Sequence, residues 1–161
     1  MILVILGTQK FQFNRLLKYI DQLIEEEVIK DDVYAQVGYS DFIPQNFKFV
    51  DFLDRKEYIE LIKKADLIIT HGGTGAILSS LKNEKRVIAV PRRSSLNEHV
   101  DNHQFEIVSV FSEQNYLIMV NNKSELTNAI INCKNKNCRK FVSNEENFLR
   151  NFETLILENQ P

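Results

Sequence analysis

The segment ADLIITHGGTG, residues 65–75, constrains the fold of this chain more than any other stretch. Its Leu67, Ile68 and Ile69 form a short apolar run, which is typical of a parallel strand covered on both faces. The residues after it change to helical spacing, with one predicted face made of Thr74, Ile77, Leu78 and Leu81. A buried strand therefore leads into a helix through a glycine-rich turn, which predicts an α/β fold with a parallel sheet.

The turn between this strand and this helix predicts a phosphate site. It consists of His71, Gly72, Gly73, Thr74 and Gly75. Glycines let an anion approach the backbone, and the free N–H groups of a first helical turn point toward it. Glycines that serve close packing alone are the alternative interpretation, because the dinucleotide fingerprint is matched only in part and no Gly-Lys-Ser/Thr follows. A diphosphate fits such a turn.

A second polar segment, Pro91 to Gln104, follows the apolar run Val87 to Val90. In open parallel sheets, ligands bind beyond the carboxyl ends of the strands, so both polar segments are expected at one crevice. The segment is rich in donors and acceptors that suit a hydroxyl-rich ligand such as a sugar: Asn97, Glu98, His99, Asp101, Asn102, His103 and Gln104. A solvated polar turn is the alternative.

Together the two motifs resemble a known family. His71-Gly72-Gly73-Thr74-Gly75 followed by Asp101-Asn102-His103-Gln104 resembles the carboxyl-terminal, donor-binding half of glycosyltransferase family 28, over residues 1–132. The likeness is to the small subunits of two-component enzymes. These include the catalytic subunit of the eukaryotic UDP-GlcNAc transferase that extends dolichol-linked GlcNAc, and bacterial counterparts in capsular and exopolysaccharide synthesis. The bacterial likeness is the stronger one, because Pro91-Arg92-Arg93 runs into Asn97-Glu98-His99-Val100-Asp101.

The resemblance implies a fold and an activity. The fold is a Rossmann-like doubly wound parallel sheet, equivalent to the carboxyl-terminal half of a GT-B glycosyltransferase. The activity is that of an inverting hexosyltransferase, which moves a sugar from a UDP-sugar to a lipid-linked saccharide acceptor. A membrane-associated partner subunit is expected to bind the acceptor and supply the general base. The alternatives are a non-catalytic nucleotide-sugar-binding subunit that enhances a partner, and a small hydrolase or epimerase.

The resemblance also implies roles for individual residues. The diphosphate is expected to bind at His71 to Gly75, with His71 near the distal phosphate. His71 is the only candidate catalytic group in the chain. The alternative is that His71 is a structural histidine. His103 and Gln104 are expected to bind the donor sugar, while Asn102 orients the helix start and Asp101 orients or caps it. The predicted nucleotide-sugar site is completed by the first loop and the second polar segment: Gly7, Thr8, Arg92 and Glu98.

One position departs from the pattern of the family. Many relatives place a glutamate four residues past the final glycine, where it accepts hydrogen bonds from the ribose, and this chain has Ser79 there. Glu98 is the candidate substitute for this ribose contact. No metal is expected, because His99 and His103 lack a third ligand and helix amides suffice for a diphosphate. No cofactor beyond the UDP-sugar substrate is expected.

Length, charge and cysteines limit the remaining possibilities. The 161 residues fit one domain, and a net charge of −2 argues against nucleic acid as a partner. The apolar run Met1 to Leu6 is too short for a signal peptide or a membrane span, so we expect a cytoplasmic protein that its partner recruits to the inner face of the membrane. Cys133 and Cys138 are expected to be free thiols.

Periodicity divides the chain into three parts. Residues 1–132 form the nucleotide-sugar-binding domain, residues 133–140 a Lys/Asn-rich linker and residues 141–161 a helical tail, which folds back on its own sheet or docks on a partner. Strands are predicted at 2–6, 33–37, 47–50, 67–69, 87–90 and 116–120, and helices at 14–27, 55–64, 74–81, 100–110 and 123–131.

Overall fold

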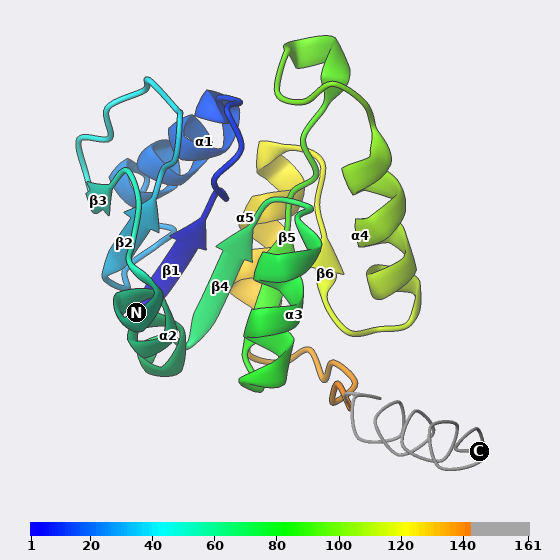
Figure 1. Cartoon of the computed structure of the whole chain (residues 1–161). Coiled ribbons are helices and arrows are strands. Elements are labelled where there is room, and N and C mark those ends of the chain that lie inside the picture. Colours follow the sequence, from blue (N-terminus) through cyan, green and yellow to red (C-terminus); the bar gives the residue numbers. More distant parts are fainter. Residues whose placement is uncertain (143–161) are drawn as a thin grey trace, which may run out of the picture.

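The structure is a computed structural model that describes residues 1–142. Its described part contains one parallel six-stranded sheet in the order β3-β2-β1-β4-β5-β6 (Figure 1). The strands are β1 (Ile2–Ile5), β2 (Val33–Gln36), β3 (Lys48–Val50), β4 (Leu67–Thr70), β5 (Arg86–Ala89) and β6 (Ile118–Met119). The chain starts in the middle of the sheet, runs outward to β3 and then returns to continue from β4. The doubly wound α/β fold is thereby confirmed, and its topological switch point lies between β1 and β4.

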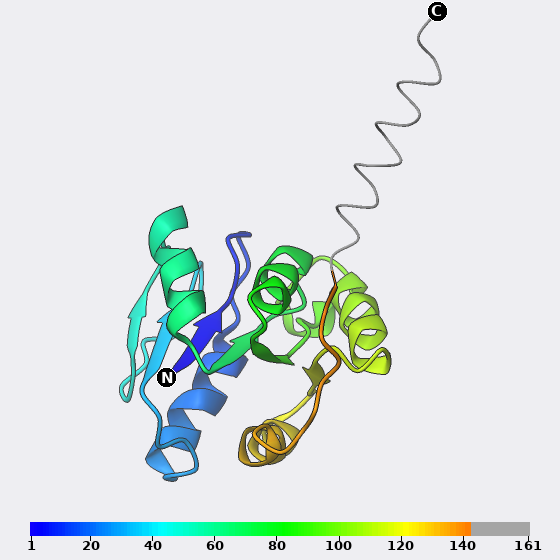
Figure 2. The ribbon, with the colours of Figure 1, turned by 90° about the horizontal axis from the view of Figure 1, so that it is seen from below.

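Helices cover both faces of the sheet (Figure 2). They are α1 (Asn14–Glu25), α2 (Arg55–Lys64), α3 (Thr74–Lys82), α4 (His103–Glu113) and α5 (Lys123–Asn132), with a short 3-10 helix η1 (Ser94–Leu96) before α4. Helices α1 and α5 lie on one face, and α2, α3 and α4 lie on the other.

The sequence of β1 explains why both faces are covered. Side chains alternate across a strand, so Ile2 and Val4 enter the core under α1 and α5, whereas Leu3 and Ile5 enter the core under α2, α3 and α4. All four are at most 3% exposed. A central strand of a doubly wound sheet therefore has no polar face, which is why its sequence is a continuous apolar run.

Some element boundaries differ from the prediction. Helix α4 begins at His103, three residues later than expected, because the segment before it forms a loop that turns Glu98 into the interior. Strand β6 is limited to Ile118–Met119, at the edge of the sheet. Within α2, Ile62 is buried, whereas Ile59 is 39% exposed.

The end of the described chain bears on the predicted linker and tail. Residues 134–142 contain no helix or strand, and Phe141 packs against Tyr116 with ring centroids 5.5 Å apart. The predicted tail helix lies outside the described residues from 143 onward, so this prediction and the three domain boundaries stay predictions. Cys133 and Cys138 are free, as expected. No helix in the part that the structure describes has the length and apolar character to cross a membrane.

Candidate functional site

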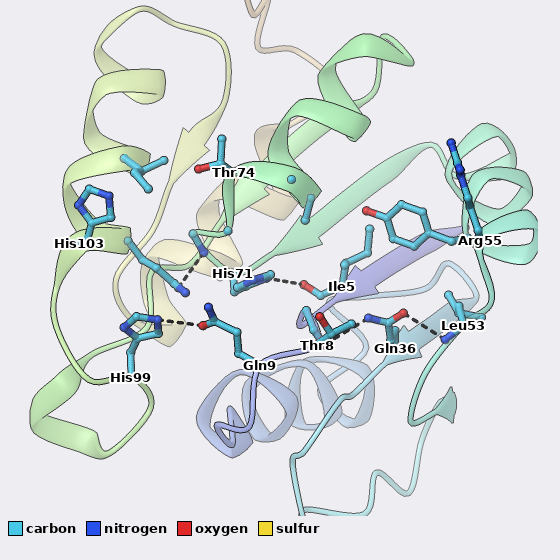
Figure 3. Close-up of a pocket in the computed structure, with 18 residues that line it drawn as sticks. Ile5, Thr8, Gln9, Gln36, Leu53, Arg55, His71, Thr74, His99 and His103 are labelled. Carbon is cyan, nitrogen blue, oxygen red and sulfur yellow. Dashed lines mark hydrogen bonds between the residues drawn. The ribbon is translucent and has the colours of Figure 1, made fainter.

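A cavity of about 660 Å³ opens at the carboxyl edge of the sheet, at the switch point between β1 and β4. Figure 3 shows His99 and His103 at one end, Leu53 and Arg55 at the other, and His71 and Thr74 between them. Nine of the predicted site residues line it: Gly7, Thr8, His71, Gly72, Gly73, Thr74, Gly75, His103 and Gln104. The structure therefore brings the first loop, the glycine turn and the start of α4 together, as expected from the strand order.

The amino terminus of α3 faces this cavity without a cap. Its N-cap residue, Gly73, makes no side-chain cap hydrogen bond. By contrast, the Asp54 side chain caps α2 by accepting hydrogen bonds from the N–H groups of Lys56 and Glu57. The first-turn N–H groups of α3 are thus left for a ligand, and the positive end of the helix dipole favours an anion there.

The glycines at this site also serve packing. A Cβ on Gly73 would lie 2.3 Å from Nε2 of His71, and one on Gly72 would lie 2.6 Å from Cβ of Gln104. Gly7 has φ +78°, a conformation that L side chains rarely adopt, and a Cβ there would lie 2.6 Å from the same His71 atom. At Gly75, however, a Cβ would meet nothing within 4 Å. The close-packing interpretation is therefore correct for three glycines, and it coexists with the open helix terminus.

His71 is a buried and uncharged ring beneath the turn. Its Nδ1 lies 3.2 Å from the carbonyl oxygen of Ile5, which can only accept, so Nδ1 carries the proton and Nε2 does not. Burial, with the charge of Arg92 as a second cause, lowers the pKa of His71 from 6.5 to about 4. At neutral pH the ring is uncharged, and its Nε2 edge lies close to Gly7 and Gly73.

Gln104 joins the loops that follow two neighbouring strands. Its Oε1 accepts hydrogen bonds from the backbone N–H of Gly72 at 3.1 Å and of Arg92 at 3.3 Å. Its Nε2 has no hydrogen-bond partner among residues 1–142, and the side chain lines the cavity. Gln104 thus shapes the turn with its oxygen and leaves its nitrogen for a ligand.

The structure contradicts the prediction that Arg92 lies at the ligand. This side chain is 1% exposed and does not line the cavity. It donates a hydrogen bond of 2.6 Å to the carbonyl oxygen of Leu6 and lies 5.4 Å from the ring centroid of Phe13. Burial lowers its pKa to about 10. Arg92 therefore links the ends of β5 and β1 beneath the loops.

Glu98 and Asn102 are likewise engaged elsewhere. Glu98 is 1% exposed and forms two hydrogen bonds of 2.8 Å with the guanidinium of Arg15, so the candidate ribose contact is wrong. The Asn102 side chain accepts hydrogen bonds from the N–H and hydroxyl of Ser94, which closes the loop before α4. Asp101, one residue before the N-cap Asn102, accepts one from the N–H of His103 at 3.0 Å, so its side chain contacts the start of α4.

The two histidines that were weighed as metal ligands have other partners. His99 is 3.0 Å from Asp101 Oδ1 through Nδ1 and 3.0 Å from Gln9 Oε1 through Nε2, so it connects two loops across the cavity (Figure 3). His103 pairs with Glu106 at 3.2 Å, with its side chain 66% exposed. No group of three potential metal ligands occurs within residues 1–142. The expected independence from metals stays a prediction.

Sequence reasoning missed one end of the cavity. Gln36, Leu53, Arg55 and Tyr58 line it beside the residues that were predicted. Gln36 donates a hydrogen bond of 3.3 Å to the carbonyl of Gly7 and accepts one of 3.2 Å from the N–H of Leu53. These residues lie at or just beyond the carboxyl ends of β2 and β3, so the rule that located the other loops also applies to them.

The comparison with protein families assigns the chain. Residues 1–159 match the family described as glycosyltransferase family 28 C-terminal domain. The chain belongs to this family. A Candida albicans protein named UDP-N-acetylglucosamine transferase subunit ALG13 is 32% identical over 118 residues, which cover 73% of this chain and 38% of that protein. The chain spans less than half the length of the first curated relatives that it matches.

Solved structures agree with the fold. An NMR structure of ALG13 superposes with a TM-score of 0.59 at 21% identity and covers 92% of each chain. The glycosyltransferase of kitacinnamycin superposes with a TM-score of 0.58 at 16% identity, over 83% of this chain and 34% of that one. At these identities the likeness shows the fold alone. The curated relatives are fungal and mammalian, so they lend no support to the predicted capsular or exopolysaccharide setting.

Proposed function

We propose that this chain is the donor-binding subunit of an inverting glycosyltransferase that uses a UDP-sugar. The observation that carries the proposal is the cavity at the switch point, whose centre is the uncapped amino terminus of α3. Membership of the family and the names of the relatives agree with this reading, and they favour UDP-GlcNAc as the donor.

The cavity fits the three parts of such a donor. The amides of the α3 terminus and the glycine turn suit the diphosphate in the middle. Gln104, through its unpartnered Nε2, and His103 suit sugar hydroxyls at the α4 end. The opposite end, lined by Leu53 and Arg55, is left for the nucleoside.

The proposed chemistry is a direct displacement. An acceptor hydroxyl attacks the anomeric carbon, its new C–O bond forms on the face opposite the leaving group, and the bond to the diphosphate oxygen breaks. The helix dipole of α3 stabilises the charge that grows on UDP as it leaves. The hydroxyl proton goes to a base on the partner subunit, because no Asp or Glu is among the described residues that line the cavity. His71, with a pKa of about 4, is a weak base in this state, so we assign it to supporting the turn.

The same absence of a cavity carboxylate favours a second candidate. A subunit that only binds the nucleotide sugar and enhances its partner would need the diphosphate site at the start of α3, but it would need no general base.

We further propose that the acceptor is a lipid-linked saccharide and that a membrane-associated partner brings this chain from the cytoplasm to the inner face of the membrane. A capsular or exopolysaccharide acceptor is one setting, and the dolichol-linked GlcNAc of the eukaryotic enzyme is the other.

Two experiments test the proposal. Calorimetric titration of the chain with UDP, UDP-GlcNAc and UDP-glucose should give saturable binding, with ADP as the control that does not compete. Transfer of labelled sugar to a lipid-linked acceptor should require membranes that contain the partner. Absence of UDP binding contradicts the donor site, and efficient turnover by the purified chain alone contradicts the two-component reading. Transfer that survives blocking this chain's cavity by Gly73→Val favours the non-catalytic subunit.

A further inference from the structure

We propose that the hydroxyl of Tyr58 selects ribose over deoxyribose by accepting a hydrogen bond from a ribose hydroxyl, an inference that rests on the proposed UDP-sugar site. Tyr58 lies on α2 and lines the cavity at the end that holds Leu53 and Arg55. The diphosphate amides occupy the middle, and the sugar-binding side chains occupy the α4 end. The ribose and base of the donor therefore lie along α2.

A chain of hydroxyl groups orients the phenol. The Tyr58 oxygen is 2.9 Å from Oγ of Ser79 on α3, and Ser79 Oγ donates a hydrogen bond of 3.1 Å to the carbonyl oxygen of Ala76. A serine hydroxyl has one proton, so Tyr58 donates its own proton to Ser79. The lone pairs of the phenol oxygen then remain as acceptors. Burial raises the pKa of Tyr58 above its ordinary value, which keeps the phenol protonated.

This arrangement supplies a neutral acceptor on α2, at the cavity. Ribose hydroxyls need an acceptor, and the described lining contains no carboxylate. In many relatives a glutamate is expected where Ser79 stands; here Ser79 is the group that turns the oxygen of Tyr58 into an acceptor.

The position of the phenol is fixed by its helix. Asp54 and Glu57 form a capping box, and the N–H of Tyr58 donates to the carbonyl of Asp54 at 2.9 Å. Gln36 holds the start of this segment to the Gly7 loop through its hydrogen bonds to Leu53 and Gly7. These hydrogen bonds tie the start of α2 to the Gly7 loop of the cavity, so Tyr58 stands on an anchored helix, as a selecting residue requires.

Calorimetry with UDP, 2′-deoxy-UDP and 3′-deoxy-UDP tests the inference on the full chain. The unaltered protein should bind UDP about five- to tenfold more tightly than one of the deoxy ligands, which is what one net hydrogen bond gives. Tyr58→Phe keeps the ring and should remove this preference while binding the deoxy ligand unchanged. Ser79→Ala should weaken the preference in part. Tyr116→Phe, the same change on a tyrosine that does not line the cavity, is the matched control.

Each other result overturns the inference in a distinct way. If the unaltered chain binds UDP but Tyr58→Phe retains its preference, the ribose role is wrong and the donor site stands. If Tyr58→Phe loses the same affinity for UDP and for both deoxy ligands, the phenol contacts the uracil ring or serves packing, and it does not bind the ribose. If the unaltered chain does not bind UDP, the proposed function fails and takes this inference with it. Circular dichroism on each variant confirms that the protein is folded.

Discussion

The buried His71 predicts that this protein loses stability in mild acid. In the folded chain its pKa is lowered from 6.5 to about 4, first by burial and then by the charge of Arg92. Between these values the unfolded chain binds more protons than the folded one, so the free energy of unfolding falls as the pH falls through this window. The loss starts near pH 6.5 and is complete below about pH 4.

The magnitude follows from the two pKa values. At about 1.4 kcal/mol for each pKa unit, the full loss is about 3 kcal/mol, of which about 2 kcal/mol is reached at pH 5. This is a large share of the roughly 5–15 kcal/mol that stabilises an ordinary domain. His71→Asn removes the titration while keeping an amide that can donate to the carbonyl of Ile5.

Urea unfolding followed by circular dichroism at pH 8, 6 and 5 measures this effect. For each variant, the change in the free energy of unfolding between pH 8 and pH 5 is compared with that of the unaltered protein. The contribution of carboxylates is common to all of them and cancels in this comparison. His71→Asn should lose about 2 kcal/mol less than the unaltered protein between pH 8 and pH 5. His103→Asn, at a histidine whose side chain is 66% exposed, should follow the unaltered protein. Parallel losses in the unaltered protein and His71→Asn would refute the reasoning.

Three further substitutions test the site. Gly73→Val, whose Cβ would lie 2.3 Å from His71 Nε2, should lower UDP affinity at least tenfold in calorimetry while circular dichroism shows a folded chain. Gln104→Ala leaves two buried backbone amides unpaired, so it should cost about 1–3 kcal/mol of stability and weaken UDP as well as UDP-GlcNAc. Glu98→Gln breaks the buried pair with Arg15 and should cost about 3 kcal/mol in urea unfolding, with UDP affinity unchanged in calorimetry.

The sequence predicted the fold and the centre of the site because both depend on local patterns. An apolar run such as that of β1 is typical of a parallel strand covered on both faces, and glycines at 72 and 73 allow the turn to pack against its neighbours. The rule that ligands bind beyond the strand ends then placed the first loop and the second polar segment together. These inferences need no knowledge of where side chains point.

The predictions that failed concern side-chain direction. Arg92 and Glu98 stand in a polar loop next to ligand residues, and the sequence does not show that both turn into the interior. The partner of Glu98 is Arg15, 83 positions away, so the ion pair leaves no local pattern. Tyr58 stands on a helix with no local pattern that marks a ligand site, yet it lines the cavity, and its hydroxyl is 2.9 Å from Oγ of Ser79. Burial of a ring and exposure of its polar tip are compatible, and periodicity reports only the first.

The direction of these charges has a consequence for the proposed reaction. Charged side chains near the cavity are engaged within the protein, since Glu98 pairs with Arg15 of α1 and Arg92 donates to the carbonyl oxygen of Leu6. The polar groups that line the cavity are amides, hydroxyls and imidazole rings, with the guanidinium of Arg55 at the end proposed for the nucleoside. Such a surface can hold a diphosphate by oriented dipoles, which need no reorganisation when charge grows on the leaving group. It offers no anionic base to the acceptor, so under the proposed function the base must arrive with the partner subunit.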